Sequence, residues 1–291
     1  MHGTVELRYL TAPGNHEVHG NMSHYKAHFT EQLFWSRDIG PVHLVSYNTE
    51  VFFWPQYYGA DNAAQQHAWL DADLAAADAN RAAVPWIVVS GHRPMYCTWP
   101  DRNGVCDGEH EASRQGLMST CSPLDGHLCT KRRGAPSNLS VEALLHKHGV
   151  DVAIFGHIHI YSRSWPVYDE HVLASGGLDA YTDPPATVHM VTGAGGNREM
   201  KTGSRVPPHG QGGSYTAFQS GYAPADGQSA DYSYSRVTVH NATTLEWEQV
   251  SGTFGGVIDH FFITRTRGVP SFGERWTLAL GTAGTAAAAV E

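Results

Sequence analysis

The chain has 291 residues, of which 41% are hydrophobic, 11% aromatic and 16% charged, so it has enough apolar surface for a sizeable core and is not disordered over most of its length. Its formal net charge of −9 argues against a nucleic-acid backbone as a partner, and no apolar run approaches the roughly 18 residues that span a membrane. The 19 histidines equal all Lys and Arg residues together, and this excess of imidazole is a first hint of metal chemistry.

The amino-terminal residues carry no basic segment followed by an apolar stretch, so no signal peptide is visible in them. Three glycosylation sequons, at Asn21, Asn138 and Asn241, are nevertheless typical of a glycoprotein on the secretory route. We therefore expect a secreted or lysosome-like location for the full-length protein. We also expect that this chain lacks the amino-terminal part of that protein.

The first half of the chain alternates helix and strand patterns. Residues 62–80 place apolar side chains at the spacing of an amphipathic helix, and residues 85–90 follow as a short buried strand. Ser140 is the expected N-cap of a second helix, and Gly149 suits the left-handed position just beyond its end. Residues 150–155 are a second buried strand, and this order predicts an α/β layered core.

Four cysteines, Cys97, Cys106, Cys121 and Cys129, lie in a loop over residues 97–129 that is rich in Pro, Gly and Asp. Two disulfides within this loop are the favoured interpretation. A zinc site is the alternative, although no CxxC pair is present to favour it.

From about residue 186 the pattern changes to strands separated by Gly- and Asn-rich turns. We expect antiparallel strands over residues 188–192, 232–239, 245–250 and 257–264, and a long irregular connection over residues 197–231. Residues 267–291 end in a Gly-, Ala- and Thr-rich run, and we expect them to form a disordered tail.

Three segments each deliver a glycine followed by a side chain of the kind that binds metals. They are Gly14-Asn15-His16, Gly91-His92 and Gly156-His157-Ile158-His159. Glycine lets the backbone turn sharply and approach an ion, and sites in α/β sheets collect in the crevice beyond the carboxyl ends of the strands. An amide oxygen and neutral imidazoles suit a first-row dication. We therefore expect the three turns to meet at one metal site.

His157 and His159 are two residues apart in a segment that we expect to be extended, so they would face the same side and could serve two ions. Each of these residues alone has an ordinary structural explanation. A single His after a buried strand is commonly a hydrogen-bonded structural residue, and a single Asn is commonly a turn residue. The same arrangement at three turns favours a functional site.

These motifs resemble those of the purple acid phosphatases, within the calcineurin-like metallophosphoesterases. The first turn, with Glu17, matches the family's GNHE block, the second its VxxH block, and residues 156–163 its GHxHxYxR block, with Ser162 in place of the usual Glu. The resemblance implies an α/β fold, here a partial αββα metallophosphoesterase sandwich over residues 1–266 that forms the C-terminal part of the catalytic domain.

The resemblance also implies roles for individual residues. Asn15, His92 and His157 would bind a divalent second metal, and His159 would bind the first metal of a dinuclear centre, Fe(III) with Zn(II), Mn(II) or Fe(II). His16 would contact the phosphate. His110, in the cysteine-rich loop, would protonate the leaving group.

The function implied is that of a metal-dependent acid phosphatase, which hydrolyses a small phosphomonoester by attack of a metal-bound hydroxide. The metals would also explain how a protein with a net charge of −9 holds an anion.

The chain departs from the family where further ligands are expected. The DxG and GDxxY blocks of the family lie upstream of GNHE, and neither precedes Asn15 here. Asp38-Ile39-Gly40 spells DxG, but it follows the GNHE block, and we do not expect Asp38 to bind metal. Only a partial ligand set is therefore present, and we expect a fragment of a longer enzyme with poor activity by itself.

Two alternatives stay open. The first is a catalytically inactive protein that keeps a one-metal pocket, which the missing carboxylates favour. The second is a metallophosphodiesterase. The sequence leaves open the physiological substrate, the metal pair, the disulfide pairing and the oligomeric state.

Overall fold

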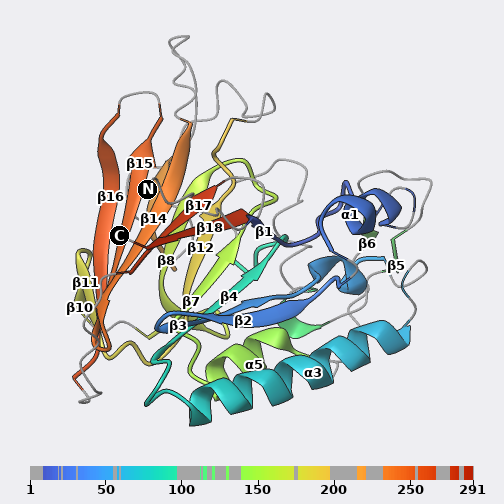
Figure 1. Ribbon diagram of the computed structural model, residues 1–291, viewed down its shortest axis with the longest axis horizontal. Helices are drawn as coiled ribbons and strands as arrows, with labels where there is room; N and C mark the ends of the chain where they lie inside the picture. The colour runs from blue at the N-terminus through green and yellow to red at the C-terminus, as the bar shows by residue number, and fades with distance from the viewer. Residues whose placement is uncertain are drawn as a thin grey trace, which may run out of the picture.

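The computed structural model describes residues 9–18, 20, 22–30, 32–54, 58, 60–96, 112, 114–116, 120–121, 129–130, 139–173, 176–196, 215–220, 232–252, 255–266, 276–281 and 285–290. In these residues two β-sheets face each other, and helices cover the outer face of one sheet (Figure 1).

The first sheet carries two of the predicted ligand turns. Its strands run in the order β13 (Thr216–Ser220), β8 (Tyr161–Tyr168), β12 (Val188–Thr192), β7 (Val152–Phe155), β4 (Trp86–Gly91), β3 (Val42–Ser46) and β2 (Trp35–Ile39), with β9 (His171–Val172) beside β8. The four strands from β12 to β3 are parallel. The strands outside them pair antiparallel.

The second sheet is almost entirely antiparallel. Its strands run in the order β1 (Tyr9–Thr11), β18 (Thr285–Val290), β17 (Trp276–Gly281), β14 (Ser233–Asn241), β15 (Thr244–Ser251), β16 (Val257–Thr264), β11 (Ala180–Thr182) and β10 (Gly176–Gly177). Among the described strands of this second sheet, only the pair β11 and β16 is parallel. The first and last described strands of the chain are therefore neighbours at one edge.

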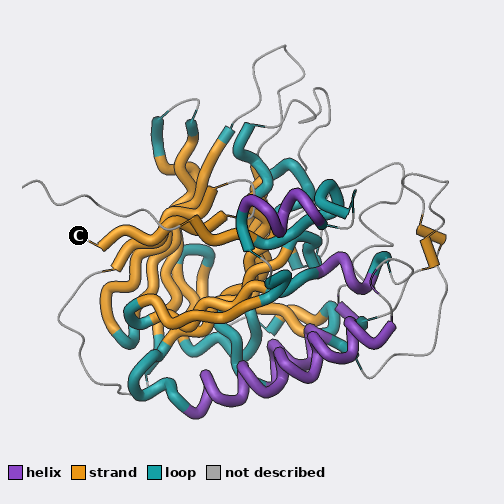
Figure 2. The backbone as a smooth tube through the Cα atoms, turned by 45° about the vertical axis from the view of Figure 1, so that its right-hand side comes forward, coloured by secondary structure: helices purple, strands orange, loops and turns teal. Residues whose placement is uncertain are grey.

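Two helices lie along the first sheet, namely α3 (Ala60–Ala79) and α5 (Val141–Lys147) (Figures 1 and 2). A shorter helix, α1 (Ser23–His28), follows the Gly14 turn, and the 3-10 helix η1 (Thr49–Phe52) follows β3. A small hairpin of β5 (Thr120–Cys121) and β6 (Cys129–Thr130) stands apart from both sheets.

Strand β4 shows how the sequence builds two cores. Trp86 and Val88 point into the core between the sheets, whereas Ile87 and Val89 point into the core beneath the helices. Successive strand side chains point to opposite faces, so a strand covered on both faces is apolar at every position. For this reason residues 86–89 form a continuous apolar run in the sequence.

The predicted α/β core is confirmed. The helix predicted over residues 62–80 is α3, in which Leu70 and Leu74 are fully buried. Ser140 caps α5 as predicted, because its hydroxyl accepts a hydrogen bond from the Ala143 N–H at 3.2 Å. Gly149 adopts a φ of +60° just beyond that helix, as predicted for the left-handed position.

The disordered tail predicted over residues 267–291 is wrong for the part of that tail that the structure describes. Strand β17 pairs with β14, and β18 pairs with both β17 and β1. A low-complexity sequence can form strands here because the ladder hydrogen bonds join backbone groups, which every residue except proline supplies in full.

The strand predicted over residues 188–192 forms as β12, but it lies inside the first sheet and not with the later antiparallel strands. It pairs antiparallel with β8, as predicted, and parallel with β7 on its other side. All five of its residues are buried, as an interior strand between two layers requires. The connection predicted over residues 197–231 also contains a strand, β13, within its described part.

The disulfide prediction concerns residues that are described only in part. Cys97 and Cys106 lie outside the described residues, whereas Cys121 and Cys129 are directly opposite each other in β5 and β6. The two disulfides stay a prediction. Within the described residues, no helix combines the length and the apolar character needed to cross a membrane.

Candidate metal centre

Two of the predicted turns are neighbours because the strands that precede them are neighbours. Strands β4 and β7 are parallel, with Gly91 opposite Phe155 at their carboxyl ends. The ladder continues one step further, since the Gly156 N–H donates to the His92 carbonyl at 3.0 Å. The backbone therefore holds His92 and His157 side by side.

Three side chains meet at this edge of the sheet. The His92 Nε2 atom lies 2.7 Å from the Asn15 Oδ1 atom and 3.1 Å from the His157 Nδ1 atom. The His92 and His157 rings are edge-to-face, with their centroids 4.9 Å apart. The three predicted ligands of the second metal are thus brought together.

Asn15 reaches the site from the other sheet, which the sequence did not predict. It lies beyond β1, which pairs with β18 at the edge of the second sheet. Its turn is closed by two hydrogen bonds, from the Gly14 N–H to the Glu17 carboxylate at 2.8 Å and from the Glu17 N–H to the Gly14 carbonyl at 3.2 Å.

Gly14 is needed in this turn for space. A Cβ atom at this position would lie 2.8 Å from the Nδ1 and Cε1 atoms of the His92 ring, closer than a carbon side chain can approach. The absence of a side chain therefore lets the Asn15 turn pack directly against the His92 ring.

The segment that follows β7 is turned, which corrects the expectation that His157 and His159 lie in an extended segment. His157 has a φ of +62°, in the left-handed region that few non-glycine residues adopt. The Ile158 N–H then donates to the Gly156 carbonyl at 2.7 Å. Such strain is found at sites where the surrounding structure holds a side chain in place for function.

A buried ion pair lies behind His157. The Arg93 Nη1 atom is 3.3 Å from His157 Nε2, on the far side of the ring from the nitrogen that faces His92. The Arg93 Nε atom lies 2.9 and 3.1 Å from the two carboxylate oxygens of Glu50, and the guanidinium is 4.2 Å from the ring centre of Phe53. Both charged groups are almost fully buried.

The sequence motifs did not predict this pair. Arg93 directly follows the Gly91-His92 turn, and Glu50 lies in none of the motifs. A signal was available, because an arginine in an apolar turn directly after a buried strand requires a buried acidic partner.

The electrostatic environment keeps the His92 imidazole neutral. Burial lowers the pKa of His92 well below its usual value, and the positive charges of His157, Arg93, His16 and His159 lower it further. Neutral imidazole is the form that binds a metal ion.

The structure locates the other predicted site residues less precisely relative to these three ligands. His16 is exposed, and both His16 and His159 lie near enough to His92 for their charges to affect it. His110 lies outside the described residues. Asp38 accepts a hydrogen bond from His43 at 2.6 Å across the β2–β3 pair and is half exposed, in agreement with a residue that is not a ligand.

The donor set fits one divalent ion. Metal–ligand bonds of about 2.0 to 2.2 Å place neighbouring ligand atoms about 2.8 to 3.6 Å apart, close to the separations around His92 Nε2. One amide oxygen and two imidazole nitrogens suit Zn(II) or Mn(II). Within the described part of the chain, no three His, Cys, Asp or Glu side chains are gathered around a common ion position. The residues that the structure describes thus fit half of a dinuclear centre.

Comparison with protein families gives two matches. The model described as calcineurin-like phosphoesterase matches residues 3–161, and the model described as iron/zinc purple acid phosphatase-like protein C matches residues 186–260. The first match alone spans more than half of the chain and includes all three turns.

Several known proteins are similar in sequence. Acid phosphatase type 7 from Danio rerio is 37% identical over 270 residues, which cover 90% of this chain and 55% of that protein. The Homo sapiens protein of the same name is 35% identical, over 94% of this chain and 56% of its own length. Purple acid phosphatase 22 from Arabidopsis thaliana is 29% identical over 69% of this chain and 39% of its own length. The chain spans about half the length of these two acid phosphatase type 7 proteins.

A solved structure shares the fold. A purple acid phosphatase from the seeds of yellow lupin, Lupinus luteus, superimposes with a TM-score of 0.55 over 82% of this chain and 34% of that one, at 21% sequence identity.

Proposed function

Because the chain belongs to the calcineurin-like phosphoesterases, in their purple acid phosphatase branch, we propose that it is part of a metal-dependent acid phosphatase that hydrolyses small phosphomonoesters. The observation that carries the proposal is the meeting of Asn15 Oδ1, His92 Nε2 and His157 Nδ1 at one edge of the first sheet.

In this proposal Asn15, His92 and His157 hold the divalent second metal, and His159 contributes to the first metal of the family's dinuclear centre. The ions supply positive charge that neutralises the phosphate oxygens and lowers the pKa of water nearby. His16 is exposed beside the ligands and binds the phosphate. His110 donates the proton to the leaving alkoxide.

The relatives' names support the hydrolytic assignment, since they are acid phosphatases. The three sequons support a secretory or lysosome-like location for the full-length protein. We propose N-linked glycans on the secreted protein. A mobility shift after glycosidase treatment tests this, and an unchanged mobility contradicts it.

Metal uptake tests the ligand assignment directly. Titration calorimetry of the chain with Zn(II) is expected to show one saturable site, and His157→Ala should weaken it about 100-fold or more, since removal of even an outer-shell partner costs 10- to 100-fold. His146→Ala is the matched control, because His146 is exposed on α5 and stacks on Tyr168 away from the three ligands. Equal affinity in the two variants would refute the assignment.

Activity tests the function. Hydrolysis of p-nitrophenyl phosphate at acid pH, with Zn(II) or Mn(II) added, is expected from a version extended upstream with DxG and GDxxY blocks and is expected to be lost in its His157→Ala variant. Equal rates for the two proteins contradict the proposal. Faster hydrolysis of bis-p-nitrophenyl phosphate would instead identify a metallophosphodiesterase.

A second candidate is a metal-binding protein without catalysis. The observation that favours it is the lack, among the described residues, of a gathered set of carboxylate and imidazole ligands for a second ion. Saturable Zn(II) uptake together with no phosphatase activity, in both the given chain and the extended version, would establish this function instead.

A further inference from the structure

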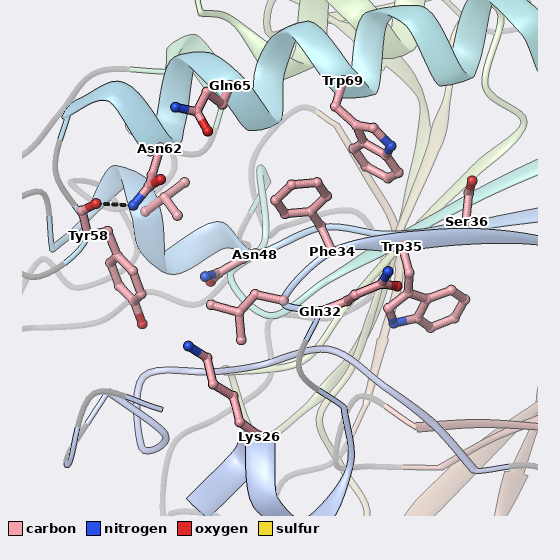
Figure 3. A pocket seen from close by; sticks show the side chains of 12 residues that line it. Lys26, Gln32, Phe34, Trp35, Ser36, Asn48, Tyr58, Asn62, Gln65 and Trp69 are labelled. Atoms are coloured by element: carbon pink, nitrogen blue, oxygen red, sulfur yellow. Dashed lines mark hydrogen bonds between the residues drawn. The ribbon is translucent and has the colours of Figure 1, made fainter. Parts of the chain in front are cut away.

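A cavity of about 650 Å³ lies between α1, β2, η1 and α3, and it contains none of the proposed metal ligands. Its volume lies in the range of small-molecule sites, which are mostly apolar with a few polar groups at defined positions. Its walls likewise consist of an apolar, aromatic part and a part with a few polar groups (Figure 3).

One part of the cavity is aromatic. Phe34 directly precedes β2, Trp35 is the first residue of β2, and Trp69 comes from the facing side of α3. The rings of Phe34 and Trp69 are in contact, with centroids 4.7 Å apart. None of the three side chains is fully buried, so part of this aromatic surface is open to a flat apolar group.

The other part presents hydrogen-bond donors. Figure 3 draws the Lys26 ammonium, the Asn48 amide nitrogen and the Tyr58 hydroxyl at the same end of the cavity, away from Trp35 and Trp69. The Asn48 Nδ2 and Tyr58 hydroxyl atoms are buried and lie close to each other, and neither has a hydrogen-bond partner at ordinary distance. Burial, followed by the negative charge of Glu50, raises the pKa of Tyr58, so its hydroxyl keeps its proton.

Asn48 is held so that its amide nitrogen is left over. Its Oδ1 atom accepts from the Glu50 N–H at 3.0 Å, and its backbone N–H and carbonyl are both bonded to the Gln66 side chain, at 2.9 and 3.0 Å. These bonds fix the residue in one arrangement. A fixed, buried donor without a partner is costly, and a ligand atom that accepts a hydrogen bond would remove that cost.

Lys26 supplies the charge. It is the only charged residue among the described residues that line the cavity, and it forms no ion pair with the described part of the chain. An ammonium, an amide N–H and a hydroxyl together select a group that accepts several hydrogen bonds and carries negative charge.

From this division we propose that the cavity binds a small organic anion that has a carboxylate or phosphate group at one end and a flat apolar body at the other. The anionic group lies among Lys26, Asn48 and Tyr58, and the apolar body lies against Phe34, Trp35 and Trp69. The site is independent of the proposed metal centre.

Calorimetry with 2-naphthoate tests this, with EDTA present so that no metal ion contributes. Saturable binding is expected, with 2-naphthalenemethanol and acetate each binding at least about tenfold more weakly, because each lacks one half of the recognised structure. No saturation with 2-naphthoate, or equal affinity for the neutral alcohol, would overturn the proposal, and this comparison needs no variant.

Two variants locate the anionic end. Lys26→Gln is expected to weaken 2-naphthoate about tenfold, as expected for loss of one charge-assisted hydrogen bond, whereas Lys147→Gln, which removes an exposed lysine on α5, should leave binding unchanged. Equal effects of the two substitutions contradict the proposal.

Tyr58→Phe separates a ligand contact from a structural one. Because the Tyr58 hydroxyl has no partner, its removal should leave the unfolding midpoint unchanged or higher while it weakens 2-naphthoate several-fold. A lower midpoint with unchanged binding would show a structural hydroxyl instead.

Discussion

At the scale of single residues, the candidate centre depends on close contact between two turns. The Asn15 turn can approach the His92 ring because position 14 has no side chain. The same closeness keeps His92 buried and therefore neutral, since burial is the largest cause of its lowered pKa. The close packing of the Asn15 turn against His92 thus requires a glycine at position 14 and also keeps the His92 imidazole uncharged.

Gly14→Ala should disturb the site by crowding. The new Cβ atom would have to move the His92 ring by several tenths of an ångström, and we expect Zn(II) affinity to fall at least about tenfold, with a loss of about 1 to 3 kcal/mol in the free energy of unfolding. Gly256→Ala is the control, because a Cβ atom there meets no other atom within 4 Å. Unchanged Zn(II) affinity in Gly14→Ala would show that the turn does not lie against His92.

His43 gives the fold a pH dependence of its own. Its burial lowers the pKa of the imidazole, but the hydrogen bonds and charges of Asp73 and Asp38 outweigh burial and raise the pKa above its usual value of 6.5. Nδ1 and Nε2 contact the two carboxylates at 2.6 and 3.0 Å. The folded state therefore holds this proton more tightly than the unfolded state.

The stabilisation from His43 should be complete below about pH 6.5 and should be lost as the pH rises through the raised value in the folded state. Urea unfolding at pH 5.5 and pH 8 checks this. We expect His43→Gln to lower the free energy of unfolding more at pH 5.5 than at pH 8, and Asp73→Asn to reduce the difference. A larger loss at pH 8 would reverse the sign and contradict the assignment.

At the scale of elements, capping and periodicity predicted the helices well, whereas buried charge was missed. Ser140 caps α5 as expected, and its hydroxyl also donates to the Arg114 carbonyl at 2.8 Å. Glu142, in the first turn of that helix, is buried and accepts hydrogen bonds from Tyr96 and from the Asp169 N–H. Local pattern places a residue on a helix, but it does not show what the helix packs against.

The C-terminal strands offer a sharp test at this scale. Leu278 lies in β17, between β14 and β18, so its backbone belongs to an interior strand. Leu278→Pro should remove a ladder hydrogen bond and lower the free energy of unfolding by about 2 kcal/mol or more, whereas Leu278→Val, which keeps the backbone N–H, should lower it less. Denaturant unfolding of both variants measures this. An unchanged free energy of unfolding in Leu278→Pro would instead agree with the disordered tail that the sequence predicted.

At the scale of the whole molecule, the two sheets are joined by buried polar bonds as well as by the core between them. Arg163 in β8 binds both carboxylate oxygens of Asp259 in β16, each at 2.8 Å, and the Tyr161 hydroxyl donates to the same carboxylate at 2.6 Å. Two conspicuous residues of the GHxHxYxR match therefore hold the sheets together instead of lining the candidate centre.

The candidate ligands also come from both sheets, because Asn15 follows β1 whereas His92 and His157 follow strands of the first sheet. An ion bound by all three would link the sheets. We expect saturating Zn(II) to raise the thermal unfolding midpoint, by the equivalent of about 2.7 kcal/mol when its concentration is 100 times Kd. The rise should be absent in His157→Ala and present in His146→Ala. A midpoint that Zn(II) leaves unchanged in the parent chain would contradict this link.

The sequence by itself predicted the α/β class, the positions of α3 and α5, the buried strands β4 and β7 and the three ligand turns. These features are local: apolar periodicity, cap residues and Gly-His pairs are all visible within a few neighbouring residues. The turns that carry His92 and His157 could be expected to meet because parallel neighbouring strands end at one edge of a sheet.

Only the tertiary structure decided which sheet delivers Asn15, that residues 276–281 and 285–290 form strands, and that a buried Arg93–Glu50 pair supports His157. Each of these depends on contacts between residues far apart in the chain. Backbone ladders accept almost any sequence, and a buried charge is tolerated only where the fold supplies a partner, so neither leaves a reliable local pattern.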